Sequence, residues 1–189
     1  MKKHYFLAVP IEEKHRAILQ NWIHMNKSKL PFKSWVHPED YHITLAFLGD
    51  IQPSSRLNEL VKRVDETVKN CHQFEISLKG IDIFGKKDSP RIFWAGVENS
   101  SSLHHVQKLI VKASEEVGFQ LDRKPFQPHI TLARKWNSDE PFIKSPGLDH
   151  VFDDKSSPSL VKSIHLYQTH LDRIPKYEAI NIFPLLQPE

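Results

Sequence analysis

Short apolar runs and amphipathic stretches alternate along the chain, and their order is repeated once. The apolar run at residues 5–9 predicts a strand, and residues 17–23 place apolar side chains at helical spacing. A second such run at residues 92–97 precedes a second amphipathic stretch at residues 106–113. Further along, the patterns predict a helix at residues 57–68 and strands at residues 74–78, 81–84 and 161–171. Strands and helices in this order indicate an α+β fold.

The hexapeptide at residues 41–46, YHITLA, returns as PHITLA at residues 128–133. The offset from His42 to His129 is 87 positions, and the same offset relates Phe6 to Phe93 and Ala8 to Ala95. A period of this length with only two copies is too long for a solenoid and predicts a duplicated subdomain. We therefore expect one domain over residues 1–189, with repeat halves at about 1–88 and 89–189. The Pro-, Ser- and Asp-rich stretch at residues 135–159 predicts a long loop.

The repeated motif places an imidazole and a hydroxyl on the same side of each predicted strand. Residues i and i+2 of a strand share a face, so His42 lies beside Thr44, and His129 beside Thr131. Two imidazoles facing one another suit phosphoryl transfer, in which a base acts on one side of phosphorus and an acid on the other. The threonine hydroxyls can donate hydrogen bonds to the phosphoryl oxygens.

A metal site is the competing chemical interpretation of these histidines. Zinc takes three or four ligands at close spacing, whereas each motif supplies one His without a neighbouring Cys or carboxylate. Most of the 12 histidines are better read as surface residues. We therefore expect catalysis by His42 and His129 with no metal and no cofactor.

Composition says more about where the protein acts than about which reaction it catalyses. The 189-residue chain carries a formal net charge of +3, which permits a phosphate-bearing ligand without requiring one. Its single cysteine, Cys71, cannot form an internal disulfide, and no apolar run approaches the length of a membrane span. These features predict a cytoplasmic protein, and we expect a monomer that does not bind membranes.

Two His-x-Thr motifs with these flanking residues resemble the 2H phosphoesterase superfamily. The resemblance extends to its bacterial RNA 2′,3′-cyclic phosphodiesterases, also called the 2′-5′ RNA ligase family, and covers nearly the whole chain. It is carried by the segments YFLAVP at 5–10, WV at 35–36, HITLAFLG at 42–49, RIFW at 91–94 and PFQPHITLAR at 125–134.

The resemblance implies a bilobal α+β fold, with two antiparallel sheets flanked by helices and a central cleft that carries both motifs. It implies hydrolysis of a 2′,3′-cyclic phosphate at RNA ends or on nucleotides to a 2′-phosphate, with a weak 2′-5′ joining activity. By analogy, His42 protonates the departing 3′ oxygen and His129 activates water. Arg134 is implied to contact phosphate, although strict alternation places it on the face of Leu132, away from Thr131. Either the strand ends or bulges at Ala133, or Arg134 does not reach the site.

Aromatic residues near the motifs are candidates for stacking on a nucleobase. They are Phe6, Trp35, Trp94 and Phe126. For any one of them, packing in the core is the more common role. Two other functions stay open at this point: a related activity on another cyclic or 2′-5′ phosphodiester, and a nucleotide- or RNA-binding module without turnover. Matched His–Thr pairs favour an enzyme, because binding alone does not need two titratable groups.

Overall fold

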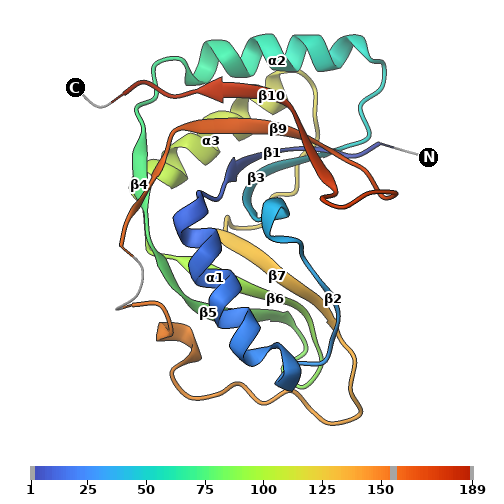
Figure 1. The fold of residues 1–189 in the computed structure, drawn as a ribbon. Coiled ribbons are helices and arrows are strands. Elements are labelled where there is room, and N and C mark those ends of the chain that lie inside the picture. The colour runs from blue at the N-terminus through green and yellow to red at the C-terminus, as the bar shows by residue number, and fades with distance from the viewer. Residues whose placement is uncertain (1–2, 154–156, 188–189) are drawn as a thin grey trace.

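A computed structural model describes residues 3–153 and 157–187 of the chain (Figure 1). Three α-helices and three short 3₁₀ segments connect the strands of these residues. In chain order the elements are β1 (Tyr5–Pro10), α1 (Glu13–Asn26), η1 (Lys27–Lys29), β2 (Phe32–Trp35), η2 (Pro38–Asp40), β3 (His42–Gly49), α2 (Ser55–Val68), β4 (Phe74–Ile76), β5 (Leu78–Gly85), β6 (Pro90–Val97), α3 (Ser101–Glu116), β7 (His129–Trp136), η3 (Leu148–His150), β8 (Ser159–Val161), β9 (Ser163–Thr169) and β10 (Tyr177–Pro184).

The strands confirm the α+β class and show how the two expected sheets are joined. One antiparallel sheet runs in the order β10-β9-β1-β3-β7-β6-β5, with β2 added alongside β7, while β4 and β8 form a separate small pair. At its middle the large sheet is held by one pairing, Ile43 with Ile130 of β3 and β7. The two expected sheets are therefore the two ends of one sheet, each forming a lobe (Figure 1).

Each lobe is built from both halves of the sequence. The upper lobe of Figure 1 holds β1, β3, β9 and β10 with α2 above them and α3 behind them, and the lower lobe holds β2, β5, β6 and β7 with α1 across them. Helix α1 follows β1 but packs on the other lobe, where Trp22 lies 6.0 Å from Phe93 between ring centroids. Helix α3 follows β6 and packs on β3. The two halves therefore exchange helices and share one core.

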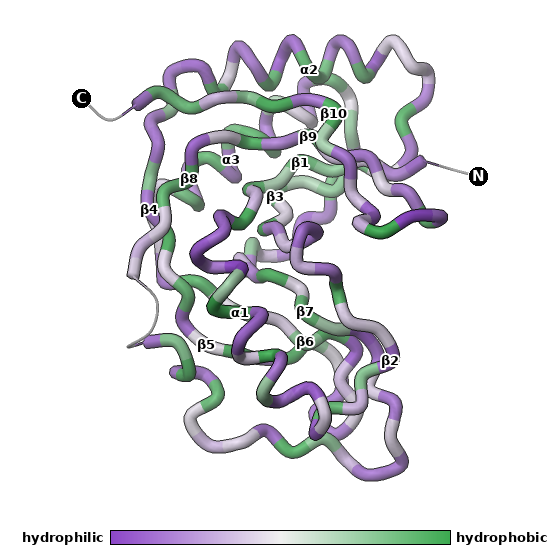
Figure 2. Tube along the Cα trace, viewed as in Figure 1, coloured by the Kyte–Doolittle hydropathy of each residue, from purple (hydrophilic) through white to green (hydrophobic). Residues whose placement is uncertain are grey.

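Burial of one side of each helix accounts for this arrangement. Helix α2 buries Leu60, Val64 and Val68, which recur at helical spacing. Hydrophobic and hydrophilic positions alternate along α2 in Figure 2, as expected for a helix with one covered side. No helix in the described part of the chain combines the length and apolar character needed to cross a bilayer.

The repeat register predicted for the first strand of each half is wrong by one residue. Phe6 and Ala8 form a small cluster with Tyr167, whereas Phe93 and Ala95 belong to the main core on the other face. The pairing shows the shift, because Leu7 lies opposite Ala46 just as Phe93 lies opposite Ala133. A slip of one residue moves every side chain of a strand to the opposite face.

Burial predicts unequal losses of stability when Phe93 and Phe47 are each replaced by alanine. Phe93 is 0% exposed and Phe47 is 58% exposed. Phe93→Ala should lower the free energy of unfolding by about 3–5 kcal/mol, because it leaves a cavity among packed aromatic rings. Phe47→Ala should change it by no more than about 0.5 kcal/mol. Urea unfolding measures both, and equal losses for the two variants would contradict the assignment of faces.

Candidate active site

The two His–Thr pairs meet where β3 and β7 join. Ile43 and Ile130 are fully buried and occupy the same position in the two copies of the motif. The histidine and threonine on either side of each isoleucine point to the opposite face of the sheet. His42, Thr44, His129 and Thr131 therefore lie together on one face, here called the site face, around a pseudo-two-fold axis between the isoleucines.

Each imidazole is held in the same way by the carbonyl two residues before it. Nδ1 of His42 lies 2.7 Å from the Asp40 carbonyl oxygen, and Nδ1 of His129 lies 2.7 Å from that of Gln127. A carbonyl only accepts, so Nδ1 donates in both rings. In the neutral rings Nε2 is then the acceptor, and Nε2 of His42 lies 3.1 Å from the Thr44 hydroxyl. The backbone thus fixes one tautomer for both histidines.

Aromatic rings surround both imidazoles. Phe6 lies 4.7 Å from the His42 ring, and Tyr177 meets that ring edge-on at 5.1 Å. Beside His129, Phe84 lies at 5.0 Å and Trp94 at 5.8 Å. Phe6 and Trp94, two of the candidates for base stacking, are buried against the His42 and His129 rings, where they support the imidazoles.

The other two stacking candidates lie elsewhere. Trp35 packs with Phe32 and Phe93, at 5.9 and 6.2 Å, among the aromatic residues of the core. Phe126 packs edge-on against His104 at 5.3 Å and lines a pocket beside His129. The structure therefore brings Phe6 and Trp94 to the imidazoles, places Phe126 next to the site, and places Trp35 away from it.

Burial makes both imidazoles hard to protonate in the free protein. It lowers the pKa of His42 to about 4, with smaller contributions in the same direction from the charges of His129 and Arg134. It also lowers the pKa of His129, again with Arg134 acting in the same direction. The charges of His129 and Arg134 thus oppose protonation of His42, and the charge of Arg134 also opposes protonation of His129. Both rings are neutral at pH 7 in the free protein.

A β-bulge in β7 decides between the two alternatives for Arg134. Pairing of β6 with β7 skips one residue, because Phe93 lies opposite Ala133 while Trp94 lies opposite Thr131. Leu132 and Ala133 are both fully buried, so the alternation resets and Arg134 returns to the site face.

The same bulge occurs in β3. Leu7 lies opposite Ala46 and Ala8 opposite Thr44, so Leu45 is skipped. The alternation then brings the exposed Phe47 to the site face. Phe47 occupies the position equivalent to Arg134. At this position the first motif therefore has an aromatic ring and the second has a guanidinium group.

Two residues that the sequence did not single out hold the His42 side of the site. The buried carboxylate of Asp40 accepts hydrogen bonds from the backbone N–H groups of Lys176 and Tyr177, at 2.9 and 3.0 Å. The same residue holds His42 through its carbonyl. Asp40 thus fixes the start of β10 and with it the Tyr177 ring on His42. Burial raises the pKa of Tyr177, while the charge of Arg134 and its hydrogen bond to the phenol act in the opposite direction.

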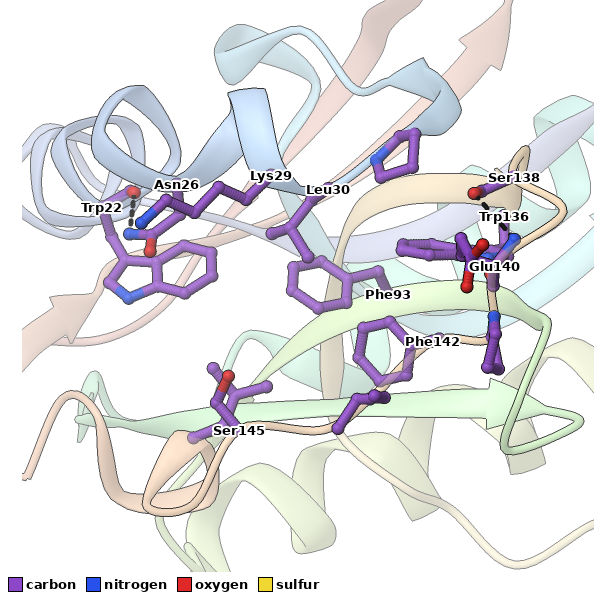
Figure 3. A pocket seen from close by; sticks show the side chains of 14 residues that line it. Trp22, Asn26, Lys29, Leu30, Phe93, Trp136, Ser138, Glu140, Phe142 and Ser145 are labelled. Atoms are coloured by element: carbon purple, nitrogen blue, oxygen red, sulfur yellow. Dashed lines mark hydrogen bonds between the residues drawn. The ribbon is translucent and has the colours of Figure 1, made fainter.

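A separate pocket lies on the face of the sheet opposite the His–Thr pairs. It is lined by Trp22, Phe93, Trp136 and Phe142 below Leu30 and Lys29, and no His is among its described lining residues (Figure 3). Phe93 and Trp94 are adjacent and point to opposite faces, so this pocket does not adjoin the His–Thr pairs. Among residues 3–153 and 157–187 there is no group of three or more His, Cys, Asp or Glu side chains that could hold a metal ion.

Comparison with known sequences agrees with this geometry. The family described as the 2′-5′ RNA ligase superfamily matches residues 18–173. A Bacillus subtilis protein named RNA 2′,3′-cyclic phosphodiesterase is 34% identical over 189 residues, covering 98% of each chain. One of the same name from Geobacillus stearothermophilus is 40% identical over 185 residues, and the chain spans 58% of its length. The chain belongs to the 2′-5′ RNA ligase superfamily.

Solved structures show the same fold at low sequence identity. Escherichia coli LigT, crystallised with 3′-AMP, superposes with a TM-score of 0.78 at 20% identity, covering 99% of this chain and 100% of LigT. A Thermus thermophilus protein superposes with a TM-score of 0.78 at 23% identity, covering 98% and 100% of the two chains. The bilobal α+β architecture is therefore shared with these proteins.

The hydrogen bonds of Asp40 predict the effect of removing its charge. Asp40→Asn leaves one oxygen to accept from two N–H groups, and hydrogen bonds to a charged group contribute about 1.5–3 kcal/mol. Amide hydrogen exchange at Lys176 and Tyr177 should therefore accelerate about 10-fold or more. Asp172→Asn, an exposed change between β9 and β10, serves as the control and should leave both amides unchanged. Unaltered exchange in Asp40→Asn would show that the carboxylate does not hold this segment.

Proposed function

We propose that this protein hydrolyses 2′,3′-cyclic phosphates at RNA ends or on nucleotides to 2′-phosphates. The observation that carries the proposal is the pair of His–Thr motifs brought together around the Ile43–Ile130 pairing. Relatives at 34% and 40% identity bear the name RNA 2′,3′-cyclic phosphodiesterase, which supports the same reaction.

The arrangement of the four side chains suits an in-line displacement at phosphorus. A water molecule attacks from one side and gives its proton to the neutral imidazole there. The P–O3′ bond breaks on the other side, where the second imidazole, protonated, delivers its proton to the departing oxygen. Thr44 and Thr131 donate hydrogen bonds to the equatorial phosphoryl oxygens, and Arg134 supplies positive charge nearby.

The division of roles depends on the bound phosphate. The resemblance makes His42 the acid and His129 the base, yet His42 is the imidazole with the more strongly lowered pKa. An anion bound between the rings favours their charged forms. We therefore propose that the cyclic phosphate itself raises the pKa of the acid as it binds. The protein then holds a neutral pair until substrate arrives.

The one partner that we propose for this chain is its substrate, namely RNA ends or nucleotides bearing a 2′,3′-cyclic phosphate. One chain contributes both His–Thr pairs and Arg134, so the site is complete without a second copy, which supports the proposal of a monomer. A 5′-hydroxyl that replaces water would give a 2′-5′ linkage, the basis for proposing a weak joining activity. The cytoplasmic location stays a prediction.

Removal of either imidazole should abolish most turnover. His42→Ala and His129→Ala should each slow opening of a 2′,3′-cyclic-phosphate-ended oligonucleotide by about 10²–10⁴-fold, the typical contribution of acid–base catalysis. Phosphorus NMR in the presence of EDTA follows the reaction and identifies the 2′-phosphate. His105→Ala, on the exposed side of α3, is the matched control and should act like the unmodified protein. Near-normal turnover by either motif variant would exclude the paired mechanism.

The lowered pKa values predict where activity is lost as pH rises. Catalysis requires one imidazolium, and in the free protein both rings lose their proton below their usual pKa of about 6.5. Since kcat/KM reports the free enzyme, it should fall as pH rises through values below 6.5. The profile of kcat should extend to higher pH, because the bound phosphate raises both pKa values. Rate profiles between pH 4 and 9 measure this, and coincident profiles would contradict it.

A further inference from the structure

Each imidazole of the site packs against one aromatic ring edge-on, and only one of these two rings carries a hydroxyl. Tyr177 meets the His42 ring at 5.1 Å, with an angle of 88° between the ring planes. Phe84 meets the His129 ring at 5.0 Å and 89°. A phenylalanine is therefore sufficient for this packing, so packing alone does not account for the hydroxyl of Tyr177.

Contacts on several sides fix the direction of the Tyr177 ring. It packs edge-to-face with Phe6 at 4.9 Å as well as with His42, and its backbone N–H donates to Asp40 Oδ1 at 3.0 Å. The carbonyl of the same Asp40 accepts from His42 Nδ1 at 2.7 Å. One residue thus holds both the imidazole and the start of the strand that carries the phenol, so the hydroxyl keeps a constant position relative to His42.

The Tyr177 hydroxyl hydrogen-bonds with Arg134, which lies on β7 of the second motif. A guanidinium can only donate, so the phenol oxygen is the acceptor in this bond. The proton of the phenol is then available to another acceptor, and within residues 3–153 and 157–187 no second protein partner meets it. Burial raises the pKa of Tyr177, which keeps the proton on the phenol near neutral pH.

The two motifs differ in the number of donors that they offer to a phosphate. Charge on the equatorial phosphoryl oxygens must be stabilised during an in-line displacement. The second motif offers Thr131 and Arg134, whereas the first offers Thr44 and, at the position equivalent to Arg134, the apolar Phe47. The first motif therefore lacks a second donor on its own strand, and Tyr177 brings one to that side from β10.

We propose that the Tyr177 hydroxyl is a further catalytic group, which donates a hydrogen bond to a phosphoryl oxygen of the bound cyclic phosphate. The hydrogen bond from Arg134 polarises the phenol and makes its hydroxyl a stronger donor. The proposal rests on the proposed function, because the cyclic phosphate between His42 and His129 supplies the acceptor. Arg134 and Tyr177 then act on one phosphate from two different strands, β7 and β10.

A double-mutant cycle separates contact with the phosphate from support of Arg134. Tyr177→Phe keeps the ring and removes only the hydroxyl, and Arg134→Met removes the guanidinium while keeping a long side chain. Opening of a 2′,3′-cyclic-phosphate-ended oligonucleotide and affinity for inorganic phosphate are measured for the wild-type protein, both single variants and the double variant. Tyr177→Phe should lower kcat/KM about 10–100-fold and weaken phosphate binding, because hydrogen bonds to charged groups contribute on this scale. A loss of about 10-fold should remain when Arg134 is already methionine.

Tyr5→Phe is the matched control, because it removes a phenol hydroxyl from another strand of the same sheet. The Tyr5 hydroxyl donates to Gln168 at 3.3 Å, and its ring belongs to the main core on the other face. This variant should keep the turnover and the phosphate affinity of the wild-type protein. Equal losses in Tyr5→Phe and Tyr177→Phe would show that the hydroxyls act only through the stability of the sheet, which would overturn the proposal.

The remaining outcomes also decide the question. Wild-type turnover and phosphate affinity in Tyr177→Phe would show that the hydroxyl does not touch the phosphate. A loss that disappears in the Arg134→Met background would show that Tyr177 acts only through the guanidinium, as a positioning residue. If the wild-type protein opens no cyclic phosphate, the proposed hydrolysis is wrong and the phosphate affinities alone decide. Weaker binding on loss of the hydroxyl, with and without Arg134, would then still support the contact, and unchanged binding would overturn it.

Discussion

The pairing of Ile43 with Ile130 fixes the geometry on which the site depends. It is the single residue pair that joins β3 to β7, and each isoleucine occupies the same position in its copy of the motif. Because side chains alternate across a strand, burying the two isoleucines on one face forces both His–Thr pairs onto the other. The bulges at Leu45 and Leu132 then return Phe47 and Arg134 to that face. Hydrophobic burial beneath the junction thus positions the polar groups above it.

The surroundings of the imidazoles connect packing with proton chemistry. Carbonyl groups of Asp40 and Gln127 orient the rings, and the neighbouring aromatic residues remove them from water. Desolvation lowers both pKa values, so the free site holds two neutral imidazoles of one tautomer. A bound phosphate anion offsets part of that desolvation. The same burial that stabilises the fold therefore links the protonation of the pair to the arrival of substrate.

The sequence was sufficient to predict the α+β class and the face shared by His42, Thr44, His129 and Thr131, because alternation along a strand is a local property. It was not sufficient to assign Arg134, since a bulge depends on the neighbouring strand. The register of Phe6 and Phe93 failed for the same reason. Asp40 and Tyr177 were missed because they are far apart in the chain and meet only when β10 pairs at the sheet edge.

The local sequence pattern also could not predict that the two halves exchange helices between the lobes. Amphipathic spacing predicted α1 and α3 but could not say which sheet each would cover, since both lobes offer an apolar surface. Nor could spacing show that Trp35 packs into the core while Phe126 packs against His104. Tertiary contacts decide these positions.

The central claim is that two imidazoles from the two motifs bind one phosphate. Nitrogen-15 NMR of the histidine side chains during titration with inorganic phosphate tests it most directly. The account predicts that the Nε2 resonances of His42 and His129 shift together, with one dissociation constant and one phosphate per chain, and that both rings become easier to protonate. A shift confined to one imidazole, or two independent dissociation constants, would contradict it.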